Sequence, residues 1–157
     1  MRARVIVASD RAASGVYEDR SGPLAAQGLR EIGFAVDEVV VVPDGHPVAA
    51  AVHSAVASGC DLVVTTGGTG IGPRDLTPDV VAPLLDRELP HLAAAVVAAG
   101  VANGVPTAAL SRGIAGTIRR TLVVCLPGST GGVRDGLAVL AKVAPHAVAQ
   151  LAGGDHG

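Results

Sequence analysis

Short runs of apolar, often β-branched residues alternate along this chain with longer alanine-rich stretches, and this alternation limits the possible folds more than any other feature. Five runs are predicted to be strands: residues 4–9 (RVIVAS), 34–42 (FAVDEVVVV), 62–66 (LVVTT), 107–111 (TAALS) and 121–126 (TLVVCL). Most of them are apolar at nearly every position, so both faces of these strands must be covered. The pattern therefore predicts an α/β fold in which a mainly parallel sheet carries helices on both sides.

The stretches between these runs carry the start and stop signals of helices. Proline is tolerated in the first turn, where its missing N–H has no partner to lose, and glycine just past the last turn readily adopts a left-handed conformation. Five helices are predicted on these signals: about residues 23–32, closed by Gly33; 47–58, opened by Pro47; one capped by Thr77; 90–102; and 131–151, kinked at Pro145.

Length and composition narrow the class of protein. A chain of 157 residues without an internal repeat or a linker predicts a single domain over residues 1–157. Tyr17 and Phe34 are the two aromatic residues and the formal net charge is −2, so the chain offers neither a base-stacking platform nor a basic face. We expect no nucleic-acid partner. Arginine dominates the basic residues, and its planar fork suits small phosphate or carboxylate ligands.

Other sequence features predict the compartment. The longest apolar run, Leu92–Ala99, is too short to cross a bilayer. The first residues lead into a strand without the pattern of a signal peptide. Cys60 and Cys125 lack a CxxC spacing and are expected to be reduced thiols. We expect a soluble, cytoplasmic protein without membrane contact.

Polar and glycine-rich clusters follow the predicted strands at their carboxyl ends. In open α/β sheets, ligands bind beyond this edge, where the strand order reverses. The clusters are Ser9–Arg11, Pro43–Gly45, Thr65–Asp79, Ser111–Gly113 and Pro127–Thr130. Because the carboxyl ends of parallel strands meet at one edge, we expect the five clusters to form one site.

The segment 65–75 (TTGGTGIGPRD) is the most informative of these clusters, with four glycines in six residues. Such a loop can turn successive backbone N–H groups toward one concavity, which binds phosphate. The loop lacks the lysine of a Walker A motif and the GxGxxG of a Rossmann fold, which excludes those two nucleotide-binding classes. The alternative is a tight turn without a ligand, although such a turn needs fewer glycines. The expected donors are Thr66, Gly67, Gly68, Thr69, Gly70 and Arg74.

Four motifs carry a resemblance to one known family, in that family's order and over essentially the whole chain. They are Ser9–Asp19 (SDRAASGVYED), Thr65–Asp79 (TTGGTGIGPRDLTPD), Thr107–Arg112 (TAALSR) and Leu126–Ser129 (LPGS). The chain resembles the molybdopterin adenylyltransferases of the bacterial Mog type, which are related to the gephyrin G domain and to protein B of molybdenum cofactor biosynthesis. The resemblance implies a three-layer α/β/α sandwich that assembles as a homotrimer.

The resemblance also implies an activity, the transfer of AMP from ATP to the terminal phosphate of molybdopterin with release of pyrophosphate. A phosphate oxygen of the substrate is the nucleophile, so catalysis needs positioning and charge neutralisation. Asp44 and Asp75 match the family's two essential acidic positions, and their implied role is to hold Mg²⁺ against the ATP phosphates. Taken alone, Asp44 is an ordinary turn residue, and Asp75 could pair with Arg74 or cap a helix.

Six further residues in these motifs are predicted ligand contacts. They are Ser9 and Asp10 on the nucleotide side, Ser111 and Arg112 on the pterin or its phosphate, and Gly128 and Ser129 as backbone donors. The alternatives are a loop-stabilising network, a surface arginine and a plain turn. Asp79, at the start of a predicted helix, is interpreted as a partner of the helix macrodipole.

Two classes of function stay open, the enzyme and a B-type protein that binds pterin or nucleotide without efficient adenylylation. The residues Thr77–Asp79 after Asp75 resemble the active type more closely. A scaffold trimer has no sequence feature in its favour. Cys125, Thr130, His91 and the pair Val96–Val97 depart from the family pattern, which affects the expected shape of the pterin pocket. A molybdenum insertase is a further implied partner.

Overall fold

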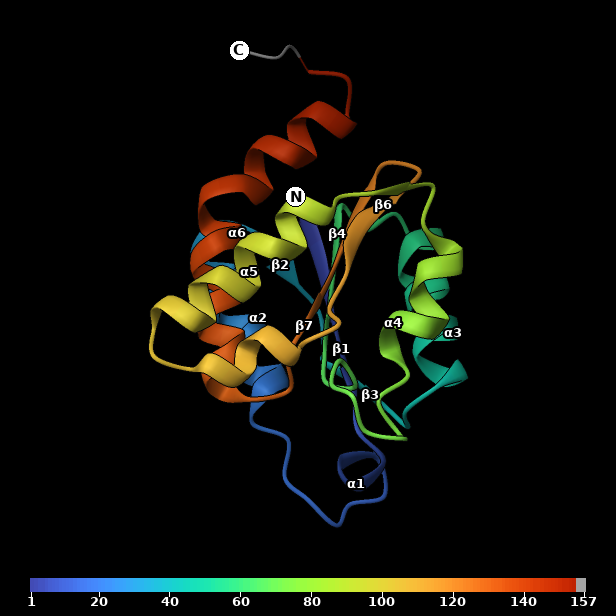
Figure 1. Cartoon of the computed structure of the whole chain (residues 1–157). Helices are drawn as coiled ribbons and strands as arrows, with labels where there is room; N and C mark the ends of the chain where they lie inside the picture. The colour runs from blue at the N-terminus through green and yellow to red at the C-terminus, as the bar shows by residue number, and fades with distance from the viewer. Residues whose placement is uncertain (155–157) are drawn as a thin grey trace.

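The computed structural model describes residues 1–154 and contains a seven-stranded sheet with helices on both faces (Figure 1). Three parallel strands form its centre: β1 (Arg2–Ala8), β4 (Leu62–Thr66) and β7 (Thr121–Leu126). The strand order is β2-β1-β4-β7-β6-β5, and β3 also pairs with β1. The predicted strands at 4–9, 62–66 and 121–126 are therefore confirmed as the middle of the sheet.

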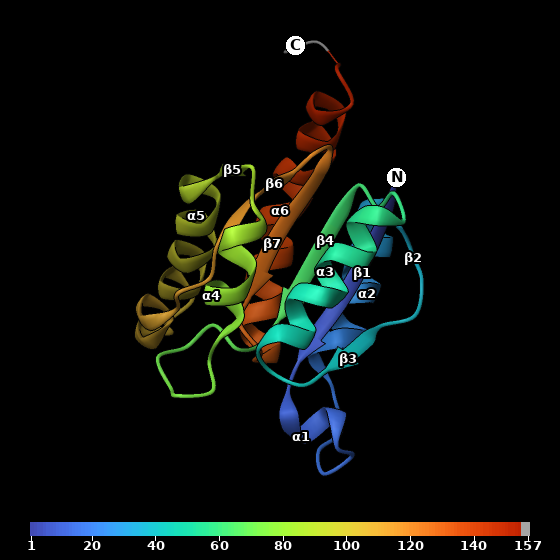
Figure 2. The same ribbon diagram turned by 90° about the vertical axis from the view of Figure 1, so that its right-hand side faces the viewer.

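Helices form a layer on each side of the sheet. One layer contains α2 (Ser21–Ile32), α5 (Pro90–Ala102) and α6 (Thr130–Leu151). The other contains α3 (His46–Ala57), α4 (Thr77–Val81) and the short 3₁₀ helix η1 (Ala82–Leu84). Figure 1 shows the sheet between the two layers, and Figure 2 shows α3 and α4 in front of it. The predicted three-layer α/β/α sandwich is confirmed.

The central strand β4 contributes to the apolar core on both faces. Successive side chains of a strand point to opposite sides, so Leu62 and Val64 pack with residues of α2 and α6, whereas Val63 packs with residues of α3. All three side chains are fully buried. Full burial of such a side chain contributes roughly 1.5–3 kcal/mol. The central strands thus provide a rigid base for the loops at their ends.

The predicted strand at 34–42 is wrong as one element. It is divided into β2 (Ala35–Val36) and β3 (Val40–Val42), both parallel to β1. Ala3 pairs with Val36 and Ile6 with Val40, so the outer chain advances four residues while β1 advances three. The extra residue interrupts the ladder next to Asp37 and Glu38, which are exposed. Charged side chains at a sheet edge have no apolar face to hold them in register.

The predicted strand at 107–111 is also wrong, because this segment belongs to the 3₁₀ helix η2 (Pro106–Leu110). The strand lies further on as β6 (Ala115–Ile118), which pairs antiparallel with β7 and with the short β5 (Arg87–Glu88). Gly116 makes this pairing possible, since a Cβ there would collide with the carbonyl oxygen of Arg87. An antiparallel strand on a mainly parallel sheet was not predicted.

The helices lie close to their predicted positions, but the prediction that Thr77 caps its helix is wrong. Thr77 is the first residue of α4, and its hydroxyl donates to the carbonyl of Gly67 instead. Gly33 closes α2 with φ +120°, as predicted. The last helix, α6, continues through Pro145 to its end. A four-residue helix, α1 (Asp10–Ala13), follows β1 directly and was not predicted. Within residues 1–154, every helix is too short or too polar to span a bilayer.

Candidate active site

The predicted site lies where the three central strands end. In both ribbon views the carboxyl ends of β1, β4 and β7 lie at the lower side of the sheet, next to α1 and the green loop that follows β4 (Figures 1 and 2). Hydrogen bonds join the strand ends there. The N–H of Gly67 donates to the carbonyl of Leu126 at 3.1 Å, and the N–H of Ser9 donates to the carbonyl of Val42 at 3.0 Å. The segment 111–113 joins them through backbone and side-chain hydrogen bonds to the same loop. The expectation that the clusters meet at one edge is confirmed.

The loop 67–76, which we call the glycine loop, has its shape because glycines allow close approaches. Gly67 and Gly68 have φ +89° and +68°, in the left-handed region that favours glycine. A Cβ at Gly70 or at Gly72 would lie only 2.8 Å from Oδ2 of Asp75. The carboxylate of Asp75 therefore folds back over glycine positions, where any side chain would displace it.

Backbone N–H groups of this loop fall into two sets. Gly72 donates to Oδ2 of Asp75 at 2.9 Å, and Asp75 donates to the carbonyl of Gly72 at 3.1 Å. The N–H groups of Gly68, Thr69 and Gly70 have no acceptor among the described residues 1–154. Three successive donors without a partner are suited to an anionic ligand.

Asp10 and Asp44 bring two carboxylates together at the ends of β1 and β3. Burial raises the pKa of the Asp44 carboxyl, the N–H of Asp10 partly offsets this, and the carboxylates of Asp10 and Asp75 raise it further. The positive charge of Arg74 lowers this pKa. Among residues 1–154, no group of three or more His, Cys, Asp or Glu side chains is arranged to hold a metal ion.

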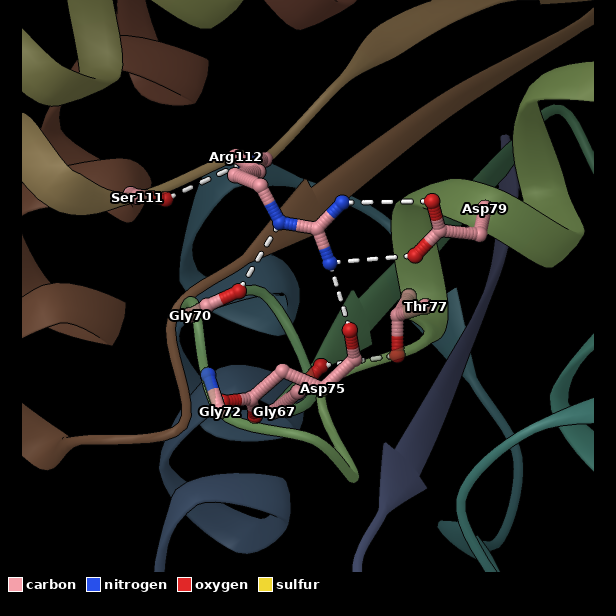
Figure 3. A network of polar contacts seen from close by, with 9 residues as sticks. Gly67, Gly70, Gly72, Asp75, Thr77, Asp79, Ser111 and Arg112 are labelled. Carbon is pink, nitrogen blue, oxygen red and sulfur yellow. Dashed lines mark hydrogen bonds and ion pairs between the residues drawn. The ribbon is translucent and has the colours of Figure 1, made fainter.

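Arg112 crosses the glycine loop from a distant part of the chain (Figure 3). Its Nε donates to the carbonyl of Gly70 at 2.9 Å, and Nη2 donates to the carbonyl of Asp75. Nη1 and Nη2 also reach the two carboxylate oxygens of Asp79 at 3.2 and 3.0 Å. Four of the five guanidinium N–H donors are thus engaged within the protein. The hydrogen bond from Arg112 holds the pKa of Asp79 below its usual value.

Two cavities open beside the glycine loop. The larger, about 720 Å³, lies between this loop, α5, η2 and the start of α6, and Val96, Val97 and Val105 form part of its apolar wall. The smaller, about 290 Å³, lies between the loop after β1 and the start of α6. Both cavities are lined by Gly67, Gly128 and Ser129, so they meet at the first residue of the glycine loop.

The hydroxyl groups of four predicted site residues are engaged in the protein itself. Ser9 accepts from the N–H of Ala12 and caps α1, and Ser129 accepts from Gly132 and caps α6. The Ser111 hydroxyl accepts from the N–H of Gly113 at 3.1 Å. The fully buried Thr66 shares a hydrogen bond of 3.0 Å with the hydroxyl of Ser21. Arg74 is exposed and forms no ion pair with the described residues 1–154.

Sequence reasoning connected Val96 and Val97 with the pocket only through the family pattern, and it missed the rest of the α5 wall and the carboxylate of Asp135 in the lining of the larger cavity. The amide of Asn103 donates a hydrogen bond to Asp135, which fixes one of its oxygens. An alanine-rich helix carries no local signal that one of its sides will line a cavity. Asp79 was visible in the sequence, but its pairing with Arg112, 33 residues away, was not.

The family comparison decides to which group of proteins this site belongs. A family model described as a probable molybdopterin binding domain matches residues 4–146. The chain belongs to this molybdopterin-binding domain family. The resemblance drawn from the four sequence motifs is thereby confirmed.

Relatives of this molybdopterin-binding domain differ in length. The molybdopterin adenylyltransferase of Pyrococcus furiosus is 41% identical over 140 residues, which are 87% of this chain and 82% of the relative. A molybdenum cofactor biosynthesis bifunctional protein of Chlorobaculum tepidum is 42% identical over 157 residues, 99% of this chain but 50% of the relative. The chain thus spans about half the length of that bifunctional relative.

A solved structure agrees with these relatives. The molybdopterin biosynthesis Mog protein from Mycobacterium ulcerans is 51% identical and superimposes with a TM-score of 0.90. The match covers 96% of this chain and 98% of that one. The predicted fold class is confirmed by this similarity as well as by the strand order.

Proposed function

We propose that this molybdopterin-binding domain transfers AMP from ATP to the terminal phosphate of molybdopterin and releases pyrophosphate. The observation that carries the proposal is the glycine loop, which presents three unpartnered N–H groups beside the carboxylates of Asp44 and Asp75. The names of relatives such as the Pyrococcus furiosus enzyme support the same reaction. Phosphoryl and nucleotidyl transfers depend on positioning and charge neutralisation, which such a loop supplies.

The carboxylates fit a magnesium ion bound together with ATP. Asp44 carries a raised pKa because it is partly buried near two other carboxylates, and Arg74 offsets only part of this repulsion. Such an excess of negative charge suits a divalent cation, and Mg²⁺ commonly uses one or two protein carboxylates with phosphate oxygens and water. We assign this role to Asp44 and Asp75, with Asp10 positioning Asp44. When bound, the ion would neutralise the charge of the ATP phosphates.

The chain's own residues would then orient the reacting phosphates. The N–H groups of Gly68, Thr69 and Gly70 would donate to phosphate oxygens, and the exposed Arg74 would add a positive charge near them. Gly128 and Ser129 lie where the two cavities meet, so their backbone would contact the bridging phosphates.

The apolar wall of the larger cavity suits the flat pterin ring, with Ser111 at its margin. Ser9, Asp10 and Thr66 lie around the smaller cavity or beside it.

The exposed apolar surface of α5 supports self-association. The helix α5 is apolar on nearly every side, yet within it only Val96 and Gly100 are buried. Val101 in the last turn of this helix and Val105 just before η2 are 44% and 46% exposed. Exposed apolar surface of this kind marks an interface between proteins. We propose a homotrimer, whose product would pass to a molybdenum insertase.

An assay with the purified protein tests the reaction. Molybdopterin, ATP and Mg²⁺ are mixed with the protein, and pyrophosphate and adenylylated pterin are measured. The proposal predicts that both products appear in equal amounts and only with Mg²⁺. Binding of molybdopterin without release of pyrophosphate would instead favour the B-type binding protein.

A further inference from the structure

The side chains of Asp79 and Arg112 form an ion pair that does more than join two surface residues. Arg112 donates a hydrogen bond from its backbone N–H to the carbonyl of Thr69 at 2.7 Å. Its guanidinium then reaches the carbonyls of Gly70 and Asp75, and finally the carboxylate of Asp79 in the first turn of α4. One residue therefore holds both limbs of the glycine loop and the helix that follows it.

We propose that Asp79 and Arg112 are positioning residues, which hold the glycine loop in the shape that presents the Asp75 carboxylate and the unpartnered N–H groups. This inference rests on the proposed adenylyl transfer for its kinetic part only. Asp79 orients the guanidinium through two hydrogen bonds, and two further donors bind the carbonyls of Gly70 and Asp75. We call this arrangement the arginine latch.

The glycine loop needs such a latch because its many glycines make it entropically costly to hold in one conformation. Glycine loses more backbone entropy on folding than any other residue, and this loop contains three glycines between residues 68 and 72. Apart from Arg112, the loop is held by hydrogen bonds between Gly72 and Asp75, by one from Gly67 to Leu126, and by two from Thr77 to loop carbonyls. The planar, rigid fork of arginine can reach two carbonyls and a carboxylate together, which the single ammonium of lysine cannot do.

The ion pair between Asp79 and Arg112 is partly exposed, so it can hold the glycine loop without contributing much to the stability of the whole fold. The side chains of Asp79 and Arg112 are 53% and 38% exposed. An ion pair this exposed contributes little to the free energy of unfolding. Loss of the Asp79 carboxylate should therefore loosen the glycine loop while the three-layer fold stays intact.

The first experiment measures hydrogen exchange of backbone amides in the full-length protein, without any substrate. We expect Asp79→Asn and Arg112→Gln to speed exchange of the Gly72 and Asp75 amides about tenfold or more, because local opening becomes easier. Asp79→Glu should restore slow exchange, since its carboxylate keeps both guanidinium contacts. The matched control is Asp37→Asn, which removes an exposed carboxylate paired with Arg2 and Arg4 far from the site.

The second experiment compares kinetic constants and melting temperatures of the same variants. For Asp79→Asn we expect kcat to fall on the order of 10²-fold, as for a misplaced reacting group. The KM for molybdopterin should change less than threefold, because the apolar cavity wall is untouched, and the melting temperature should stay near that of the wild type. Asp37→Asn should match the wild type in every measurement, and Asp79→Glu should recover most of kcat.

The results of these two experiments distinguish failure of the arginine latch from failure of the proposed adenylyl transfer. Wild-type exchange rates at Gly72 and Asp75 in both Asp79→Asn and Arg112→Gln would overturn the latch. Faster exchange with an unchanged kcat would overturn the positioning role. A wild-type protein that releases no pyrophosphate would refute the proposed function instead, and the exchange measurement would still decide whether the latch exists.

Discussion

Asp10 and Asp44 hold each other through a reciprocal pair of hydrogen bonds. The backbone N–H of Asp44 donates to Oδ1 of Asp10 at 2.9 Å, and that of Asp10 donates to Oδ2 of Asp44 at 3.2 Å. These bonds connect the ends of β1 and β3, which lie 34 residues apart in the sequence. The position of the Asp44 carboxylate therefore depends on Asp10, even if Asp10 itself touches no ligand.

Asp10→Ala tests this dependence. The variant leaves the Asp44 N–H without its acceptor, and a lost hydrogen bond to a charged group costs about 1.5–3 kcal/mol, less where water can replace it. We expect a urea midpoint slightly below that of the wild type together with a clear loss of adenylyl transfer. Full activity in Asp10→Ala would show that Asp44 keeps its position without Asp10.

Gly70→Ala tests the close approach between the glycine loop and Asp75. A Cβ at residue 70 would lie 2.8 Å from Oδ2 of Asp75 and must displace this carboxylate. Since the change affects an edge loop and no core side chain, the melting temperature should change by only a few degrees. Adenylyl transfer should fall at least about tenfold, because the displaced group is one of the two assigned to Mg²⁺. A crystal structure of the variant with Asp75 unmoved would contradict this explanation.

The buried thiol of Cys125 predicts that the free energy of unfolding depends on pH in the alkaline range. Burial raises the pKa of its thiol to about 11, above the usual 9.0. Because the folded pKa exceeds the unfolded one, the favourable contribution is fully present below pH 9 and is lost as the pH rises toward 11. The free energy of unfolding should fall over this window by up to roughly 3 kcal/mol. The difference between wild type and Cys125→Ser, measured by urea unfolding at several pH values, isolates this contribution, and a difference independent of pH would contradict it.

Truncation of a side chain in the central strand β4 is expected to cause the largest loss of stability among these variants. Leu62 is fully buried under the α2 and α6 layer, and Leu62→Ala should cost about 2–5 kcal/mol through lost burial and a cavity. The control is Val16→Ala at a side chain that is 78% exposed, which should change stability by less than about 0.5 kcal/mol. Equal urea midpoints for the two variants would mean that β4 is not part of the stable core.

The central strands, and the edge at which the polar and glycine-rich clusters meet, could be predicted because their signals are local. The runs at 62–66 and 121–126 are apolar throughout, which occurs in strands covered on both faces. Glycines and acidic residues directly after these strands must lie at the same edge. The family resemblance then assigned Asp44 and Asp75. That the chain forms a single domain over residues 1–157 stays a prediction.

The errors arose where pairing partners, rather than local pattern, decide the structure. The run at 107–111 has the composition of a strand, but Pro106 opens a 3₁₀ helix and the ladder partner of β7 comes later, at 115–118. The run at 34–42 is interrupted because the edge of β1 accepts it only in two pieces. Arg112 was predicted to bind the pterin or its phosphate, yet four of its five guanidinium donors are engaged within the protein, two by the glycine loop and two by Asp79. Such contacts between distant segments have no local signal.

Asp75→Asn tests the central claim, that the glycine loop and its carboxylate act on the phosphates of ATP. The amide has the same shape and can still accept from the N–H of Gly72, so the loop and the melting temperature should stay as in the wild type. Single-turnover release of pyrophosphate from ATP with molybdopterin and Mg²⁺ is the direct measurement. We predict a rate lower than that of the wild type by about 10²-fold or more. Release at the wild-type rate would contradict the account.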